Sequence, residues 1–246
     1  MKVKFSAILL AAMTLSNVFI ANSTLAVEEG TQNIVANTQS DEVGRRVALF
    51  DGPKGHSCTA IMLTPNFGLT AAHCGNGFQE GNVGKVSPAQ SARQSPFGSM
   101  NISLFNPYDN KDIAFVYGKD SDKSGDYKNY QKTFANKDLQ LKGFTSDELK
   151  GFVGKKVYSF GYPYDYDGYK QYKFTGEITY ADENAIHTTM PSHGGQSGSA
   201  VFLEGSNELI GILIRGGQNN KAIIQPITQD ISNWYHTKKK DIESKN

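Results

Sequence analysis

Residues 194–200 read Gly-Gly-Gln-Ser-Gly-Ser-Ala, a serine set among glycines. Two earlier segments belong with it, Thr-Ala-Ala-His-Cys at residues 70–74 and Lys-Asp-Ile-Ala-Phe at residues 111–115. Each segment alone has an ordinary interpretation, because a glycine-rich stretch is also typical of a flexible loop and the chain contains five histidines. Together, they supply one histidine, one aspartate and one serine in that order. The combination indicates a single reactive site.

The chemistry of such a site follows from its three side chains. A serine hydroxyl is a weak nucleophile at neutral pH, so it needs an imidazole to accept its proton and a carboxylate to hold the imidazole in the right tautomer. We expect Ser197, His73 and Asp112 to fill these roles. Attack on a carbonyl group also places negative charge on its oxygen, and amides beside glycines can turn toward that charge. The amides of Gly195 and Ser197 are the expected oxyanion hole.

Length and composition limit the possible architectures. The chain has 246 residues, of which 38% are hydrophobic and 25 are glycines, enough for one large domain or two small lobes, and two lobes fit best. The net charge of +1 argues against a nucleic-acid partner, and the lysines at 238–240 are expected at a solvated helix end. No cofactor is expected.

Residues 1–26 are typical of a secretory signal peptide, with basic residues, an apolar run and small residues before the expected cleavage site. The mature chain is then expected to begin near Val27, with residues 27–33 as a possible short pro-segment. A membrane anchor is the alternative, but Thr14, Ser16 and Asn17 interrupt an apolar run shorter than the roughly 20 residues that a membrane span needs. We expect no membrane association after signal removal.

Cys58 and Cys74 are the two cysteines of the chain. An exported protein meets oxidising conditions, so we expect these cysteines to form a disulfide. The bridge would fix the backbone beside His73 and contribute about 3 kcal/mol in the loop-entropy model. A metal site is the alternative, but structural zinc needs four ligands at closer spacing, and we expect no metal.

Short strands separated by glycine-rich or polar turns account for most of the chain. In the first half we expect strands at 47–50, 59–63, 68–70, 102–105 and 113–117. In the second half we expect them at 156–160, 176–180, 185–188, 200–202, 208–213 and 222–225. Strands of this length and spacing favour an all-β fold with a closed antiparallel barrel in each half.

The division between the two barrels is expected near residue 140, giving an amino-terminal barrel at 34–140 and a carboxy-terminal barrel at 141–246. Residues 119–136 are polar and predict a connector that crosses the surface. Residues 230–240 predict a carboxy-terminal amphipathic helix, with Trp234 as a packing anchor. His73 and Asp112 then come from the first barrel and Ser197 from the second, so the active site is expected between the barrels.

Over residues 34–240 the chain resembles the chymotrypsin-like serine peptidases. The first half is similar to animal trypsins at 70–74, and at the Ile34-Val35 pair that precedes Cys58. The second half is more similar to bacterial glutamyl endopeptidases, at 160–163, 176–180, 194–199 and 209–212. The resemblance implies two antiparallel six-stranded Greek-key barrels with a carboxy-terminal helix, an acyl-enzyme mechanism and a protein or peptide substrate. We expect a monomer.

Three positions depart from these relatives. Trypsins have an acidic residue before the nucleophile, where Gln196 stands here, and an aspartate six positions before it, where Pro191 stands. Glutamyl enzymes have a histidine at the position of Leu213. The resemblance therefore implies neither a strong amine–carboxylate activation switch nor cleavage after Lys, Arg or Glu. Cleavage after Asn33, with Gln196 accepting a hydrogen bond from the new amino terminus, is an open alternative to Val27 as the working terminus.

The expected substrate contacts lie on two segments near the nucleophile: Pro191, Ser192, His193, Leu213, Ile214, Arg215 and Gly216. Residues 214–216 would pair with an extended substrate through backbone hydrogen bonds. His193 faces either the pocket or solvent. Five tyrosines at 162–172 either line the rim of the cleft or lie on an exposed surface loop.

These observations favour a secreted serine endopeptidase over two alternatives. The first alternative is a catalytically silent binding protein on the same scaffold, because a fold alone does not establish activity. The second is a toxin or processing protease of narrow specificity, which differs from the leading hypothesis only in its range of substrates.

Overall fold

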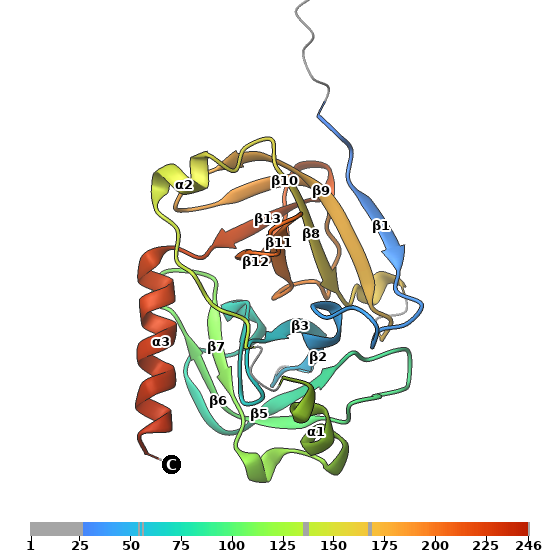
Figure 1. The fold of residues 1–246 in the computed structure, drawn as a ribbon, viewed down its shortest axis with the longest axis vertical. Helices are drawn as coiled ribbons and strands as arrows, with labels where there is room; N and C mark the ends of the chain where they lie inside the picture. Colours follow the sequence, from blue (N-terminus) through green and yellow to red (C-terminus); the bar gives the residue numbers. More distant parts are fainter. Residues whose placement is uncertain (1–26, 54, 56, 135–137, 167–168, 246) are drawn as a thin grey trace, which may run out of the picture.

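The computed structural model describes residues 27–53, 55, 57–134, 138–166 and 169–245. Two antiparallel barrels lie against each other, and a long helix runs along one side (Figure 1). The predicted signal peptide lies outside the described residues. Among the helices that the structure describes, none is long and apolar enough to cross a membrane.

The first barrel is closed by six strands. They are β2 (Val47–Asp51), β3 (Ser57–Met62), β4 (Phe67–Thr70), β5 (Gln79–Pro88), β6 (Met100–Pro107) and β7 (Ala114–Tyr117), in the spatial order β2-β3-β4-β7-β6-β5. The sixth strand therefore lies beside the third, as in a Greek key. The sequence predicted five of these strands and missed β5, whose polar, glycine-containing sequence includes a register shift between Glu80 and Gly84.

The second barrel repeats this arrangement. Its strands are β8 (Lys156–Gly161), β9 (Tyr172–Ala181), β10 (Ile186–Pro191), β11 (Ala200–Leu203), β12 (Leu209–Gly216) and β13 (Lys221–Pro226). They follow the order β9-β10-β13-β12-β11-β8, and pairing of β8 with β9 closes the ring. The predicted pair of six-stranded barrels is confirmed. An additional strand, β1 (Thr31–Ile34), pairs antiparallel with the first residues of β9.

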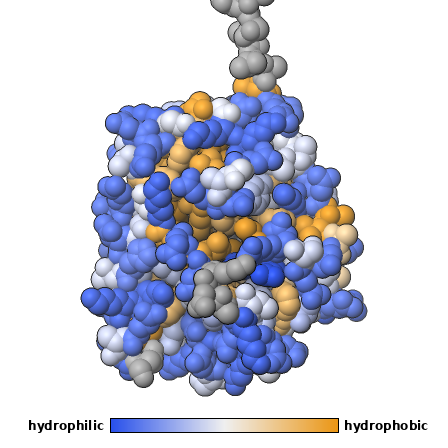
Figure 2. Space-filling model, viewed as in Figure 1, coloured by the Kyte–Doolittle hydropathy of each residue, from blue (hydrophilic) through white to orange (hydrophobic). Residues whose placement is uncertain are grey.

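Buried hydrophobic side chains form three clusters, one inside each barrel and one shared by both, because successive side chains of a strand point to opposite faces. On β3, Ala60 and Met62 point into the first barrel, whereas Ile61 belongs to a cluster shared by both barrels. Phe160 and Phe202 enter this shared cluster from the second barrel. Figure 2 shows a mostly hydrophilic outer surface, with hydrophobic side chains gathered in the middle of the upper barrel. The shared cluster fixes the relative position of the two barrels, and thereby the positions of the segments that carry the site.

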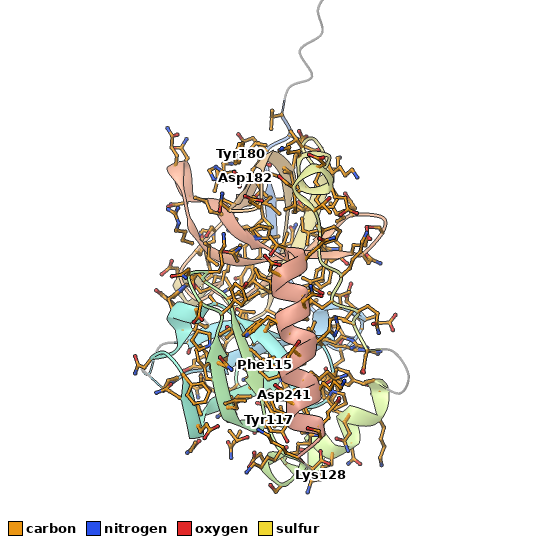
Figure 3. The ribbon with its side chains drawn as sticks, turned by 90° about the vertical axis from the view of Figure 1, so that its left-hand side faces the viewer. Phe115, Tyr117, Lys128, Tyr180, Asp182 and Asp241 are labelled. Atoms are coloured by element: carbon orange, nitrogen blue, oxygen red, sulfur yellow. A yellow bond between two sulfur atoms is a disulfide. The ribbon has the colours of Figure 1, made fainter. Side chains whose placement is uncertain are left out.

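The long helix is α3 (Gln229–Glu243), which begins after Thr228, whose side chain accepts a hydrogen bond from the amide of Ile231. It starts at the second barrel and runs down beside the first (Figures 1 and 3). Trp234 packs edge-on against Tyr108 and Phe115 of the first barrel. The predicted carboxy-terminal helix is confirmed, and it joins the two barrels from outside.

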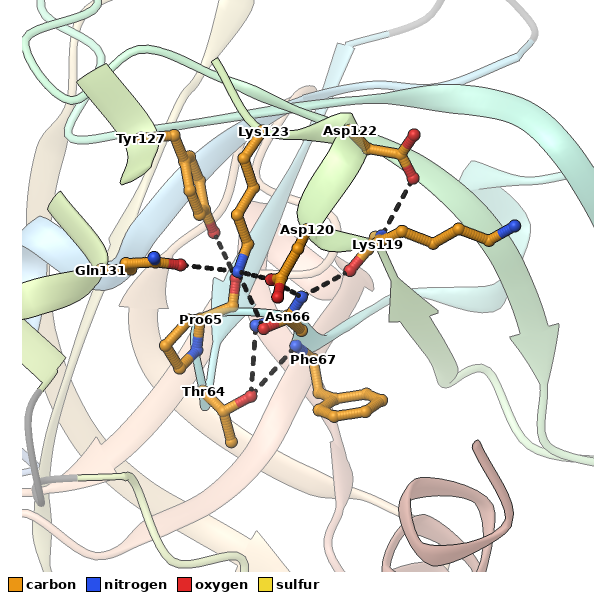
Figure 4. A network of polar contacts seen from close by, with 11 residues as sticks. Thr64, Pro65, Asn66, Phe67, Lys119, Asp120, Asp122, Lys123, Tyr127 and Gln131 are labelled. Atoms are coloured by element: carbon orange, nitrogen blue, oxygen red, sulfur yellow. Dashed lines mark hydrogen bonds and ion pairs between the residues drawn. The ribbon is translucent and has the colours of Figure 1, made fainter. Parts of the chain in front are cut away.

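The segment at 119–136 is more than the surface connector that its polar sequence predicted. It contains the helix α1 (Gly125–Tyr130), whose Tyr127 and Tyr130 are buried in the core of the first barrel. Lys123, with 1% of its side chain exposed, donates hydrogen bonds through Nζ to Asn66, Asp120 and Gln131 (Figure 4). A buried cation needs such partners, so this network anchors the segment to the barrel.

The remaining helical elements are short. They are α2 (Ser146–Lys150) and the 3-10 helices η1 (Gly44–Arg46), η2 (Ala72–Cys74), η3 (Asp120–Asp122), η4 (Gln131–Phe134), η5 (Tyr164–Tyr166) and η6 (Gln218–Asn220).

Candidate active site

Three chain segments meet at the interface of the barrels. His73 lies in η2, directly after β4, and Asp112 lies just before β7, the strand that pairs with β4. Ser197 lies in the turn between β10 and β11 of the second barrel. The pairing of β4 with β7 brings the histidine and the aspartate together, and the packing of the barrels adds the serine.

The three side chains form a hydrogen-bonded chain. Nε2 of His73 lies 2.8 Å from Oγ of Ser197, and Nδ1 lies 2.7 Å from Oδ2 of Asp112. The backbone amide of His73 also donates to Oδ1 of Asp112 at 2.9 Å. Because the carboxylate accepts at Nδ1, the ring proton is assigned to Nδ1 and the lone pair of Nε2 faces the serine hydroxyl.

Asp112 is held in its charged form. Burial alone would raise the pKa of this carboxyl, but the hydrogen bonds from the ring and the amide of His73 outweigh it and hold the pKa below its usual value. A carboxylate that stays ionised fixes the ring orientation and stabilises an imidazolium when one forms.

The turn before Ser197 directs two backbone amides into the site. The carbonyl of Gly194 accepts a hydrogen bond from the amide of Tyr164 at 2.9 Å, so across the trans peptide the amide of Gly195 points the opposite way. Gly195 has φ +94°, and a Cβ there would collide with the carbonyl oxygen of Tyr162. Within the described part of the chain, the amides of Gly195 and Ser197 donate to no other group. Both therefore remain available for a ligand oxygen.

The predicted disulfide is confirmed: Cys58 of β3 is bonded to Cys74 of η2. The bridge links the residue after His73 to the neighbouring strand. The two sulfurs and the ring of His73 lie together in space, within 4.8 Å, but the sulfurs are bonded to each other and are not thiolate ligands.

A cavity of about 460 Å³ opens beside Ser197 and His73. Six predicted substrate contacts line it: Ser192, His193, Leu213, Ile214, Arg215 and Gly216. Pro191, the last residue of β10, lies opposite Lys221 and is not among the lining residues described. Asp165 of η5 and Asn220 of η6 also line the cavity. The sequence did not suggest them, because the positions of these short helices depend on the folded barrel.

His193 is held by contacts on both of its sides. Its Nε2 lies 2.7 Å from Oε1 of Gln32 in β1, and the ring meets Tyr166 edge-on. Burial lowers the pKa of His193, although the nearby Asp165 carboxylate acts in the opposite direction. His193 is therefore part of the cavity lining, with a ring that is neutral at neutral pH and tethered to Gln32. The sequence left open whether this side chain faces the pocket or solvent, and it did not reveal the contact with Gln32.

Residues 214–216 present an unpaired strand edge. On one side β12 pairs with β13, with Arg215 opposite Ile223 and Gly216 opposite Ala222. On the other side β11 begins at Ala200, opposite Ile212, so in the described structure no strand flanks 214–216 there. This edge is open to an extended peptide.

The tyrosines at 162–172 lie partly in the core and partly on the surface. Tyr162 is buried, whereas Tyr164, Tyr166 and Tyr169 are exposed. The ring of Tyr164 lies directly over Gly194. This tyrosine therefore lies beside the turn at residues 192–199 that carries Ser197, the proposed nucleophile turn.

Comparison with known proteins agrees with this geometry. The sequence model of the family described as Trypsin matches residues 34–235. The chain belongs to the trypsin family. Its membership confirms the resemblance expected from residues 70–74 and 194–200, and the two barrels with the helix on their flank are the fold of this family.

Individual members of the trypsin family show how far the similarity reaches. A glutamyl endopeptidase from Bacillus licheniformis is 28% identical over 159 residues, which cover 61% of this chain and 46% of that protein. The matched region thus spans less than half of that relative. Among solved structures, a Glu endopeptidase in complex with MPD has a TM-score of 0.68 at 21% identity, covering 86% of this chain and 97% of that one.

A second solved structure, the protease Anisep from Arthrobacter nicotinovorans, has a TM-score of 0.62 at 17% identity. The match covers 84% of this chain and 98% of that one. At such identities the two structures establish a shared fold.

Proposed function

We propose that this trypsin-family protein is a secreted serine endopeptidase in which Ser197, His73 and Asp112 form the catalytic triad. The observation that carries the proposal is the continuous chain of hydrogen bonds, 2.8 Å from Ser197 to His73 and 2.7 Å from His73 to Asp112. Its order, spacing and partner atoms match the requirements for activating a serine hydroxyl.

In the first half of the reaction, Nε2 of His73 takes the proton of Ser197 as Oγ attacks the peptide carbonyl carbon. The proton on Nδ1 stays on the ring and donates its hydrogen bond to Asp112, whose carboxylate balances the positive charge of the imidazolium. The developing oxyanion accepts hydrogen bonds from the amides of Gly195 and Ser197. His73 then protonates the leaving amine, the C–N bond breaks, and an acyl group remains on Ser197.

In the second half, a water molecule replaces the amine. His73 takes a proton from this water, which attacks the acyl carbon, and the same two amides stabilise the second oxyanion. Return of the proton to Oγ releases the carboxylic acid and restores Ser197. The open edge at 214–216 would hold the substrate extended during both halves.

The cavity suggests a preference for an uncharged side chain before the scissile bond. Ser192, Leu213 and the neutral ring of His193 offer no buried charge to pair with a substrate ion. Asp165 and Arg215 carry opposite charges, and both are exposed, where water and salt screen them. Burial of an unpaired substrate charge is costly, so charged side chains would be disfavoured.

Two features support secretion. Residues 1–26 have the composition of a signal peptide, and the Cys58–Cys74 disulfide suits an oxidising compartment.

A fluorophosphonate probe tests the enzymatic proposal, because it bonds covalently to an activated serine. We expect the purified mature protein to label at Ser197, and Ser197→Ala to abolish labelling. Ser199→Ala is the matched control, since it removes a neighbouring hydroxyl that has no hydrogen-bond partner among the described residues. Wild-type protein that folds but does not label would instead favour a silent binding protein.

A further inference from the structure

Thr59 lies on β3, next to the disulfide cysteine Cys58, in the first barrel. It is fully buried, and it faces the nucleophile turn of the second barrel. A threonine in an apolar strand is ordinary in sequence, because threonine has a high β-propensity. Its hydrogen bonds give it a further role.

Both the backbone and the side chain of Thr59 bind the nucleophile turn. Its amide donates to the carbonyl oxygen of Ser197 at 2.8 Å, and its Oγ1 donates to the carbonyl oxygen of Gly195 at 2.9 Å. One residue of the first barrel thus holds the carbonyl groups of both residues whose amides form the proposed oxyanion hole.

Thr59 is itself held in place from two directions. Its Oγ1 accepts a hydrogen bond from the amide of Tyr162 at 3.1 Å, and its carbonyl oxygen accepts one from the hydroxyl of Thr70 at 2.7 Å. Because the Tyr162 amide donates to Oγ1, the hydroxyl hydrogen of Thr59 is directed to Gly195. The hydroxyl therefore has a defined donor direction.

The turn needs such a constraint because of its composition. Gly194 and Gly195 are adjacent glycines, and glycine gains access to backbone conformations that other residues rarely adopt. Rotation of the peptide between them would turn the Gly195 amide away from the oxyanion. The Tyr164 amide holds the Gly194 carbonyl, and the Thr59 hydroxyl holds the Gly195 carbonyl, so Gly195 is fixed at both of its peptide groups.

We propose that Thr59 is a positioning residue, whose hydroxyl holds the Gly195 carbonyl so that the Gly195 amide stays directed at the oxyanion. This inference rests on the proposed function. The geometry of the oxyanion hole then depends on the docking of the two barrels, because Thr59 is in one barrel and the turn that it binds is in the other. Preorganised donors of this kind stabilise charge without reorganising during the reaction.

The test measures the rate constant for fluorophosphonate labelling of Ser197 in the full-length mature protein, per folded molecule. The phosphoryl oxygen of the probe needs the same two amides as a peptide oxyanion. We expect Thr59→Val to lower this rate constant on the order of tenfold to a hundredfold, less than the 10²–10³ that follows loss of a whole oxyanion donor. Thr59→Ser retains the hydroxyl and should remain within about threefold of wild type.

Two further variants separate positioning from folding. Thr59→Ala differs from Thr59→Ser by one oxygen atom, so this pair gives the comparison if Thr59→Val does not fold. Thr38→Val is the remote control, because it also removes a buried hydroxyl that donates to a carbonyl, that of Ala89 at 2.6 Å. A general loss of stability would lower the melting temperatures of Thr38→Val and Thr59→Val and leave both labelling rate constants unchanged.

A peptide that the wild type cleaves supplies the second readout. Loss of oxyanion stabilisation should lower kcat and leave KM within about twofold, because the interaction is made in the transition state. Equal labelling by wild type and Thr59→Val, or equal losses in Thr59→Ser and Thr59→Ala, would overturn the inference and leave the proposed function standing. Wild-type protein that does not label would overturn both.

Discussion

Nε2 of His193 lies 2.7 Å from Oε1 of Gln32, and this contact joins the amino-terminal strand β1 to the turn that carries Ser197. The same turn is closed internally, since the amide of His193 donates to Oε1 of Gln196 at 2.5 Å. The wall of the cavity beside Ser197 therefore depends on a residue more than 150 positions away in the chain.

This tether leads to a prediction on pH and specificity. Burial lowers the pKa of His193, so its ring is neutral at pH 7.5 and gains its charge only below the ordinary histidine value of about 6.5. We expect a peptide library to show cleavage after uncharged residues at pH 7.5. Cleavage after Asp or Glu should rise as the pH falls below about 6.5, because a protonated ring tolerates a substrate carboxylate.

His193→Ala should remove that rise, and His187→Ala, a change at an exposed histidine of β10, should retain it. A profile dominated by Lys or Arg would contradict the interpretation of this cavity. So would strong cleavage after Glu at pH 7.5 that His193→Ala leaves unchanged.

The carboxylate of the proposed triad gives a second prediction. Asp112→Asn leaves the shape intact but offers an amide to Nδ1 of His73, which favours the wrong tautomer, and we expect kcat to fall on the order of 10⁴-fold. Asp109→Asn, an exposed change three residues earlier, should leave kcat near the wild-type value. A loss of less than tenfold in Asp112→Asn would remove Asp112 from the mechanism.

The lowered pKa of Asp112 also predicts the direction of a stability effect. A carboxyl whose folded-state pKa lies below its unfolded value stabilises the fold at pH values above the unfolded pKa, and this contribution is lost as the pH falls through the folded pKa. The difference in the free energy of unfolding between wild type and Asp112→Asn should therefore shrink between about pH 5 and pH 2. Urea titrations across this range measure it.

Residues with strong local signals were predictable from the sequence. The short motifs around His73, Asp112 and Ser197 have distinctive neighbours, and the spacing of glycine-rich and polar turns predicted all of the barrel strands except β5. That strand is polar and contains glycines, so its pairing with β2 and β6 stabilises it more than its own propensity does. The assignment of catalytic roles remains a prediction from motif and geometry together.

Contacts made only in the folded chain had no such signal. Thr59 looks like an ordinary strand residue, and its hydrogen bonds to Gly195 and Ser197 exist because two barrels dock. Gln32 lies in a segment that the sequence analysis treated as a possible pro-segment, yet it contacts His193 across the fold. The polar sequence around Lys123 likewise did not indicate that this side chain is buried.

Lys123 gives a further prediction. Lys123→Met removes three hydrogen bonds from a buried Nζ, and charge-assisted bonds of this kind contribute more than neutral ones. Asp120 stays hydrated because 84% of its side chain is exposed, so the loss should be moderate. We expect the free energy of unfolding to fall by about 1–3 kcal/mol, with kcat unchanged.

Chemical denaturation of Lys123→Met and of a control variant checks this value. Lys128→Met changes an exposed lysine of α1, labelled in Figure 3, and should stay within about 0.5 kcal/mol of wild type. Equal stabilities of the two variants would show that the network in Figure 4 does not anchor the segment.

The last prediction concerns the working amino terminus. Two sites compete, Val27 after signal removal and Ile34 after cleavage following Asn33. In the structure Ile34 pairs with Tyr172 as the last residue of β1, and Oε1 of Gln196 already accepts the amide of His193.

Retention of residues 27–33 preserves further contacts. Thr189 donates its hydroxyl to the carbonyl of Glu28 at 2.7 Å, and Gln32 holds His193. Cleavage after Asn33 would remove both contacts and most of β1. The new amino terminus would gain a hydrogen bond to the neutral Gln196 side chain, which is weaker than the bond that a carboxylate would form.

We therefore expect terminal sequencing of active protein to find Val27. A chain that begins at Ile34 should be less active and should lose the pH-dependent cleavage after acidic residues, because its His193 is no longer tethered. Full activity confined to molecules that begin at Ile34 would establish the activation switch instead.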